Sequence, residues 1–502
     1  MKHLGFLLLL AGTALGGCSL IPDYERPALP VEASFPDGPA YRADTSEPAA
    51  LAADTLGWRD FFRDPALQHL IEIALANNRD LRVAVLNVAA AQAQYRVQHA
   101  DLFPKIALSG SGQFEEIPAN TAIAFGGGTP GTTGTGSTVA TSVAQTGPQS
   151  ITFRSFAAGI GFTNYELDLF GRIRSLSDEA FEQYLGQEST RRSAQISLIA
   201  EVAAGWFAVL TDRELVRVTE ETLKSDVASY DLAKLQLSGG TATALNARQA
   251  ETAVDTARAN LFQFTRQEAQ DENALALLLG QAVPADPADG KTLDNQGLIA
   301  DLPAGLPSDL LTRRPDIVAA EHSLLAANAN IGAARAAFFP SITLTAQDGV
   351  ASNHLSNLFT GGSTNWSFAP QLTLPIFTAG QNQANLDLAK IQKNIQVAQY
   401  EKAIQTAFRE VADALASRGT YGDQVKAQQE LVTATADSLN LAQMRFKVGI
   451  DSYLPVLDAQ RSLYTAQQTL LTLKQAQLGQ QATLYKALCG GWVETSGQER
   501  AE

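Results

Sequence analysis

The sequence lacks most of the features from which enzymes and nucleic-acid-binding proteins are built. It has only five histidines, and no two of them stand at metal-ligand spacing. The glycine run 126–128 precedes neither a lysine nor a predicted helix, so it does not form a phosphate-binding loop. Acidic residues outnumber basic ones by 52 to 37, and the formal charge of −15 argues against nucleic acid as a partner. We therefore expect no catalytic residues, no metal and no bound cofactor.

Long apolar runs, aromatic residues and cysteines are also scarce. After Ala14 the chain has no window of 18 uninterrupted apolar residues, so the sequence predicts no transmembrane helix. Aromatic residues make up only 7% of the chain, whereas alanine, leucine and glutamine are plentiful. This composition suits long helices in close contact. The only cysteines are Cys18 and Cys489, so stability must come from packing or oligomerisation.

The first 18 residues resemble the export signal of a bacterial lipoprotein. A short positive start and the apolar run 4–14 precede Leu15-Gly16-Gly17-Cys18, which resembles a lipobox. The run is shorter than the roughly 20 residues of a membrane span. The resemblance implies cleavage before Cys18, which would carry S-diacylglycerol and N-acyl (palmitate) groups, and these acyl chains would anchor the chain stably. The alternative is an ordinary signal peptide with an incidental cysteine. Ser19, where an aspartate would favour inner-membrane retention, favours the outer membrane.

The chain contains an internal duplication. Residues 80–108 align without a gap with 316–344, and residues 232–240 align with 441–449. The extra residues of the first half form a Gly/Thr/Ser-rich stretch at 126–147. Each half therefore predicts one plan: a helix, two strands joined by a loop, a very long helix, a tip and a return helix.

The predicted strands have the pattern of a membrane barrel. They lie at about 104–117, 151–169, 340–349 and 365–377, and apolar residues alternate with small or polar ones. A soluble sandwich strand would alternate in the same way. Four strands cannot close a barrel, and an open sheet edge is not viable in lipid. If these strands lie in a membrane, several chains must contribute to one barrel.

The predicted helices are unusually long. Residues 172–237 and 381–448 contain no proline, and each could form a coiled-coil helix of about 100 Å. The return helices 243–279 and 452–488 and the incoming helices 80–102 and 316–338 are shorter. We expect a return helix and an incoming helix to stack end to end beside each long helix. The predicted organisation is a signal peptide (1–17), an extended lipid-linked segment (18–53), a first repeat (54–280), an equatorial linker (281–314), a second repeat (315–490) and a tail (491–502).

Several motifs are spread over the predicted repeats: 58–65 (WRDFFRDP), 165–172 (YELDLFGR), 313–317 (RRPDI), 377–380 (FTAG) and 457–462 (LDAQRS). With these motifs the chain resembles the TolC-like outer-membrane factors, in their lipoprotein branch, which are the exit ducts of RND-type tripartite multidrug efflux systems. The resemblance implies a mainly α-helical fold with a transmembrane β-barrel. A homotrimer would form a 12-stranded barrel, four strands per chain, continuous with a periplasmic α-barrel. It also implies an outer-membrane channel that passively exports drugs or other small amphipathic compounds. Its expected partners are a periplasmic adaptor, an inner-membrane RND pump and outer-membrane lipid.

Two groups of residues are candidate functional sites. The hairpin tips contain Gly239, Gly240 and Thr241 in the first half, and Val448, Gly449 and Ile450 in the second. Glycine permits the chain to reverse there, so the tips could be turns only; the family resemblance implies contact with the adaptor.

The second group is a candidate periplasmic gate formed by Leu454, Asp458 and Arg461, which share one helical face. If this face points inward in a trimer, leucines can dewet the pore and an acidic ring favours cations. Asp458 and Arg461 could also pair within or between chains and hold the mouth shut. The alternative is a solvated ion pair on an outer face. The family's constriction falls on these positions. Phe446, just before the tip, is expected to pack against this region.

Two other functions share some of these features. A periplasmic coiled-coil adaptor is built from compact β-rich modules around one helical hairpin, which the duplication does not match. A duct for protein secretion has the same fold as an efflux duct and is separated from it here only by analogy.

Overall fold

The computed structural model describes residues 19–41, 56–117, 151–284, 291–299, 313–488 and 491–496. The predicted signal peptide, Cys18 and the Gly/Thr/Ser-rich stretch 126–147 lie outside these residues. The chain divides into two compact units. Unit 1 comprises Met1–Asp23, Gln94–Ala180 and Asn328–Ile391, and unit 2 comprises Tyr24–Ala93, Phe181–Ala327 and Gln392–Glu502.

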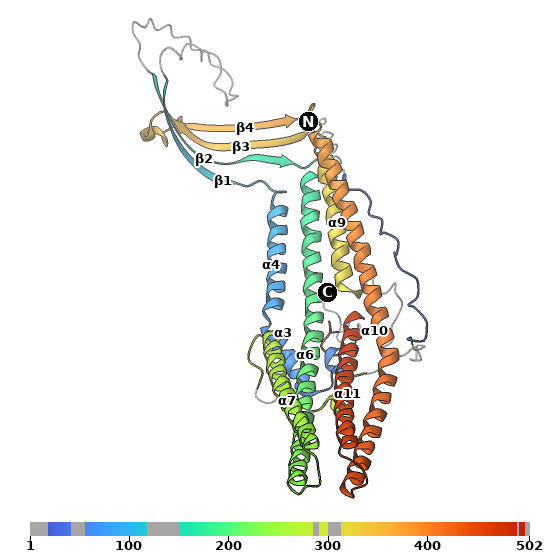
Figure 1. Cartoon of the computed structure of the whole chain (residues 1–502). Coiled ribbons are helices and arrows are strands. Elements are labelled where there is room, and N and C mark those ends of the chain that lie inside the picture. The colour runs from blue at the N-terminus through green and yellow to red at the C-terminus, as the bar shows by residue number, and fades with distance from the viewer. Residues whose placement is uncertain are drawn as a thin grey trace. The chain divides into compact units, whose positions relative to one another are not determined.

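Unit 1 contains one four-stranded antiparallel sheet in the order β1-β2-β3-β4 (Figure 1). Its strands are β1 (Ala107–Ile117), β2 (Ile151–Leu167), β3 (Ser341–Ser352) and β4 (Thr364–Thr373). The last strand was predicted to reach residue 377 and ends four residues earlier, at Thr373, because Thr373 pairs with Ser341, the first residue of β3, and the partner strand offers nothing beyond it. Both halves of the sequence contribute two strands, and β2 and β3 join them.

The sheet exposes large apolar side chains that no other part of the described chain covers. Leu108 in β1 is 84% exposed and Trp366 in β4 is 73% exposed, and Ile160, Phe368 and Leu372 are also exposed. Apolar surface of this kind is stable only against lipid or another chain. Its two edges, β1 and β4, have no further strand partner among the described residues.

The two central strands approach each other closely at glycines. A Cβ atom on Gly161 would lie 2.1 Å from the carbonyl oxygen of Ala346, and one on Gly349 would lie 2.2 Å from that of Ala158. The register shifts between Phe162 and Tyr165, where Asn164 has a φ of 55°. Side chains at either glycine would therefore force the β2 and β3 backbones apart.

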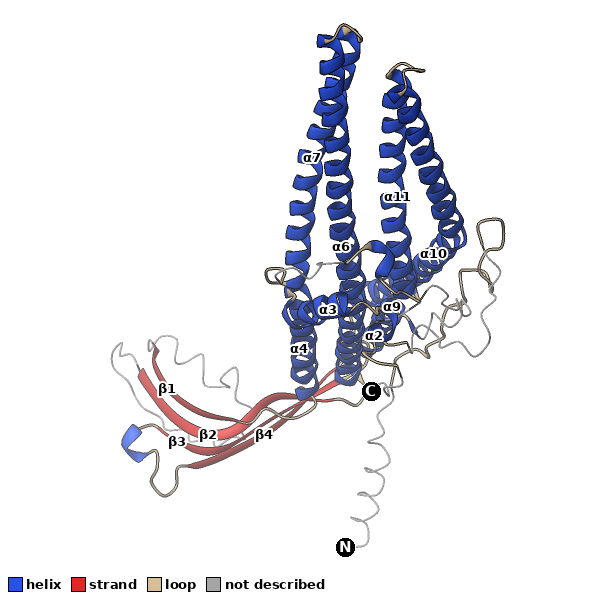
Figure 2. Cartoon of the chain, turned by 90° about the horizontal axis from the view of Figure 1, so that it is seen from below, coloured by secondary structure: helices blue, strands red, loops and turns tan. Residues whose placement is uncertain are grey.

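The helices include two long antiparallel hairpins, which Figure 2 shows side by side. The first joins α6 (Arg172–Ser238) to α7 (Ala244–Leu279), and the second joins α10 (Gln381–Lys447) to α11 (Leu454–Ala487). The incoming helices are α4 (Arg79–Ala100) and α9 (Pro315–Ala336), and the short helices are α2 (Trp58–Phe61) and α3 (Pro65–Asn77). Because these sequences contain few helix breakers before the tip glycines, each long helix runs 67 residues.

The end-to-end stacking of return and incoming helices is confirmed. The Asn78 side chain donates from Nδ2 to the carbonyl oxygen of Leu278 (2.8 Å) at the end of α7. Its Oδ1 accepts from the backbone N–H of Leu81 (2.8 Å) and caps the start of α4. Arg314 donates from Nη1 to the carbonyl oxygen of Ala487 (3.3 Å) and joins the start of α9 to the end of α11.

The main core of unit 2 surrounds the middle of the long helices. Trp206 and Tyr400 are fully buried there, and Phe61 stacks on Tyr485 with ring centroids 4.1 Å apart. The hydroxyl group of Tyr485 donates to the carbonyl oxygen of Leu56 (2.6 Å), so this buried polar atom has a hydrogen-bond partner. Among the described helices, only α6 has a stretch long and apolar enough to cross a membrane, and more than half of that stretch is buried in the protein.

Candidate gate and hairpin tips

The first tip connects α6 to α7 through a left-handed glycine. Gly240 has a φ of +75°, and the backbone N–H of Thr241 donates to the carbonyl oxygen of Gln236 (2.9 Å). Thr243 then caps α7 by accepting from the N–H of Asn246 (3.3 Å). Gly239, Gly240 and Thr241 are exposed at this turn, so the turn interpretation holds and the surface is accessible to a partner.

The second tip has the same backbone plan with an additional ion pair. Gly449 has a φ of +78°, and the N–H of Ile450 donates to the carbonyl oxygen of Arg445 (3.0 Å). The Arg445 guanidinium also donates to both carboxylate oxygens of Asp451, at 2.5 Å and 3.0 Å. Val448 and Ile450 are exposed apolar residues at this braced turn. An exposed apolar pair on a fixed turn is suited to contact another protein.

The three predicted gate residues lie on one exposed face of α11. Leu454 is its first helical residue, and Asp458 and Arg461 follow at one-turn and two-turn spacing. No hydrogen bond or ion pair joins Asp458 to Arg461 in the described part of the chain, so the within-chain pairing allowed by the sequence is not formed. The pairing between chains stays a prediction.

The opposite face of α11 packs the second hairpin onto the first. Tyr453, Val456 and Leu457 form a buried cluster with alanines of α6, α7 and α10, namely Ala233, Ala247, Ala250, Ala253 and Ala442. Small side chains let these helices approach closely. Phe446 packs against Tyr453 with ring centroids 5.5 Å apart, as expected from its place before the tip. The gate residues are therefore held at the free surface of a four-helix contact.

Sequence reasoning missed one charged residue beside the gate. Asp226 in α6 is only 6% exposed, and its Oδ1 has no hydrogen-bond partner among the described residues. It lines a small cavity together with Gln460, Arg461 and Tyr464 of α11. Burial raises the pKa of Asp226 to about 6, and the charge of Arg461 opposes that rise. The sequence signal that could have revealed Asp226 is its helical spacing from Val218 and Ala233, because these residues share a stripe of α6 that is otherwise apolar and buried.

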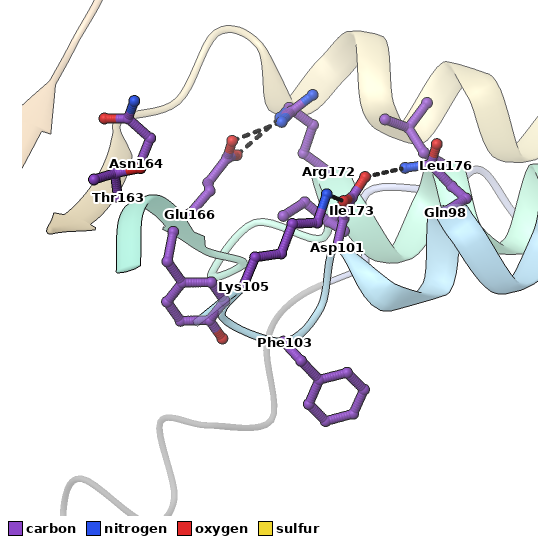
Figure 3. Close-up of a pocket in the computed structure, with 11 residues that line it drawn as sticks. Gln98, Asp101, Phe103, Lys105, Thr163, Asn164, Glu166, Arg172, Ile173 and Leu176 are labelled. Carbon is purple, nitrogen blue, oxygen red and sulfur yellow. Dashed lines mark hydrogen bonds and ion pairs between the residues drawn. The ribbon is translucent and has the colours of Figure 1, made fainter. Parts of the chain in front are cut away.

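Unit 1 contains a larger polar cavity, of about 350 Å³, where the sheet meets α6 (Figure 3). Glu166 accepts two hydrogen bonds from Arg172 (2.8 Å and 2.6 Å), and Lys105 pairs with Asp101 (2.6 Å). Tyr165 donates to the carbonyl oxygen of Leu102 (3.0 Å). The charged side chains of the cavity are thus paired with one another. We therefore interpret the cavity as a structural junction between strand and helix rather than a ligand site. Three of the residues, Tyr165, Glu166 and Arg172, belong to the 165–172 motif.

Comparison with known proteins identifies the family. The family described as outer membrane efflux protein matches residues 70–281 and 306–490, the two sequence repeats. This chain belongs to that family. It is 52% identical over 494 residues to the antibiotic efflux pump outer membrane protein ArpC of Pseudomonas putida, covering 98% of this chain and 97% of the relative. The same figures apply to the toluene efflux pump outer membrane protein TtgC of the same species.

The fold is similar to that of solved outer-membrane channels. The open-state outer membrane channel MtrE of Neisseria gonorrhoeae is 37% identical, with a TM-score of 0.82 over 96% of this chain and 100% of that one. The predicted TolC-like resemblance and the outer-membrane location are confirmed. Membership of this channel family also rules out the periplasmic adaptor, and it places the chain among channels rather than enzymes.

Proposed function

We propose that three copies of this chain form an outer-membrane efflux channel whose 12-stranded barrel is closed by the exposed sheet edges. The observation that carries this proposal is the four-stranded sheet of the described residues, with uncovered apolar side chains and two unpaired edges, β1 and β4. Both features are satisfied together when the edge of one chain pairs with the edge of the next in lipid. The exported compounds are drugs, solvents or similar small amphipathic molecules, since the relatives are named for antibiotic and toluene efflux.

We further propose that the exposed tips bind a periplasmic adaptor, which links the channel to an inner-membrane pump of the RND type. The apolar pair Val448 and Ile450 on a braced turn supports this contact. Leu454, Asp458 and Arg461 would face the axis in the trimer and close it. Rings of leucine exclude water from a narrow pore, and rings of aspartate select cations. Docking of the adaptor at the tips, next to these residues, would then open the gate.

The lipid on Cys18 remains a proposal that the described residues support indirectly. The residues that follow it are held on α9: Arg335 donates to the carbonyl oxygen of Leu20 (3.0 Å), and Asn328 donates to that of Pro22 (2.7 Å). Ile21 also lies so close to Gly332 that a Cβ there would be 2.6 Å from its Cγ1. A lipid attached just before this segment would therefore be tethered to unit 1, which carries the sheet.

The experiment that tests the function is complementation of a strain that lacks its own outer-membrane channel. Expression of this chain with its adaptor and pump should restore resistance to antibiotics or toluene. Expression without the pump is the control and should restore nothing. Failure to change susceptibility, in cells where heat-resistant trimers are present in the outer membrane, would contradict an efflux role and favour the secretion alternative.

A further inference from the structure

The small cavity behind the gate has an uncommon composition for a helix interface. It has a volume of about 50 Å³ and lies between α6, α7 and α11. Its polar lining comprises Thr222, Asp226, Thr256, Gln460, Arg461 and Tyr464. Gln460 donates weakly to Ser225 and Ser229 (3.4 Å each), whereas its Oε1 and the Oδ1 of Asp226 have no partner in the part of the chain that the structure describes. A buried carboxylate without a hydrogen bond is unfavourable unless an opposite charge compensates for it.

Arg461 supplies an opposite charge at this cavity, but no ion pair joins it to Asp226 in the described part of the chain, and burial outweighs its effect. Of the described residues, it is the only basic one that lines the cavity; α7 contributes Ala253, Thr256 and Ala257, none of which titrates. Tyr464 donates to or accepts from Thr219 (2.9 Å), and Tyr453 lies within electrostatic range of both Asp226 and Arg461. Burial raises the pKa of Tyr453, so this phenol stays neutral. The electrostatic balance of the cavity therefore depends on Asp226 and Arg461.

We propose that Asp226 is a positioning residue of the gate: its buried carboxyl group lets α11 pack against α6 of the same chain when it is protonated, and weakens this packing when it is ionised. This inference rests on the proposed gate role of Arg461.

The arrangement makes the gate sensitive to pH. In the packed arrangement burial raises the pKa of Asp226 from 3.8 to about 6, with Arg461 opposing the rise. If α11 moves away and water reaches the carboxyl group, its pKa falls back toward 3.8. Protonation therefore favours the closed arrangement. Its contribution is complete below pH 3.8 and is lost as the pH rises through about 6. Between about pH 7.5 and about pH 5, the closed-to-open ratio should rise roughly tenfold per chain.

The test is the pH dependence of conductance of the purified full-length channel in planar bilayers. Wild-type conductance should fall on acidification, with a component of midpoint near pH 6. Asp226→Asn mimics the protonated acid and should remove this component. Asp231→Asn, an exposed carboxylate on the same helix, is the matched control and should keep the wild-type profile. A wild-type profile in Asp226→Asn would overturn the proposal.

A second variant keeps the proposal testable if Asp226→Asn does not assemble. Arg461→Gln removes the opposing charge and should move the midpoint to higher pH, whereas Arg461→Lys should move it back. An unchanged midpoint in Arg461→Gln would also overturn the proposal. The gate itself is judged separately by Asp458→Ala. If that variant opens the channel while Asp226→Asn retains the wild-type profile, the gate assignment stands and the role of Asp226 is wrong.

Discussion

Asn78 and Arg314 occupy equivalent positions in the two repeats, and each donates a side-chain hydrogen bond to the last turn of its return helix. Asn78 reaches Leu278 and Arg314 reaches Ala487. Unlike Asn78, Arg314 also forms two ion pairs: its guanidinium contacts the carboxylates of Asp316 (2.6 Å) and of Glu410 in α10 (2.8 Å). Its side chain is only 7% exposed. Burial by itself would lower its pKa, but the two carboxylates outweigh burial and raise it, so Arg314 stays charged.

This buried charge predicts a large effect of removing it. Arg314→Met should destabilise the protein by about 3 kcal/mol, because it leaves Asp316 and Glu410 without their partner and the end of α11 without a donor. The effect is measured as a lower denaturant midpoint for loss of helical circular dichroism in the detergent-solubilised protein. Arg409→Gln, on an exposed position of the neighbouring turn, is the control and should change stability by less than about 0.5 kcal/mol. Equal effects of the two substitutions would contradict the role assigned to Arg314.

The close approach of β2 and β3 predicts a position-specific glycine requirement. Gly161→Ala places a Cβ against the Ala346 carbonyl and should reduce the yield of heat-resistant trimer several-fold. Gly110→Ala in β1 meets no described atom within 4 Å and should assemble normally. Semi-native gel electrophoresis of membrane extracts compares the two. Normal assembly of both variants would mean that the strands can separate without loss of the barrel.

The lipid on Cys18 should have a limited role once the trimer has formed. Cys18→Ala should lower the amount of assembled trimer, because each monomer loses its tether before it pairs with others. The trimers that do form should conduct like wild type, since twelve strands already hold them in the membrane. Quantitative extraction with detergent, followed by bilayer recording, measures both quantities. Recovery of the variant as a water-soluble protein would contradict the barrel itself.

Sequence reasoning predicted the fold well where local rules decide it. Long proline-free segments ended by Gly240 and Gly449 define the hairpins, and the alternation around Trp366 and Phe368 defines a strand. Local rules failed where a distant residue decides the outcome. The ion pair of Arg314 with Glu410 is one example, and the cavity that Asp226 and Arg461 both line is another. In each case the two residues come from separate parts of the sequence, and the sequence around one residue does not specify the other. The pairing of Asp458 with Arg461 was allowed by their spacing, but no hydrogen bond or ion pair joins them in the part of the chain that the structure describes.

Conductance of single trimers in planar bilayers shows whether the exposed face of α11 closes the channel. Wild-type trimers should conduct weakly without adaptor, because the Leu454 and Asp458 rings narrow the mouth. Asp458→Ala should raise the conductance and reduce cation selectivity. Asp437→Ala, a substitution in α10 away from this face, is the control and should behave like wild type. If Asp458→Ala conducts no better than wild type, the exposed face of α11 does not close the channel.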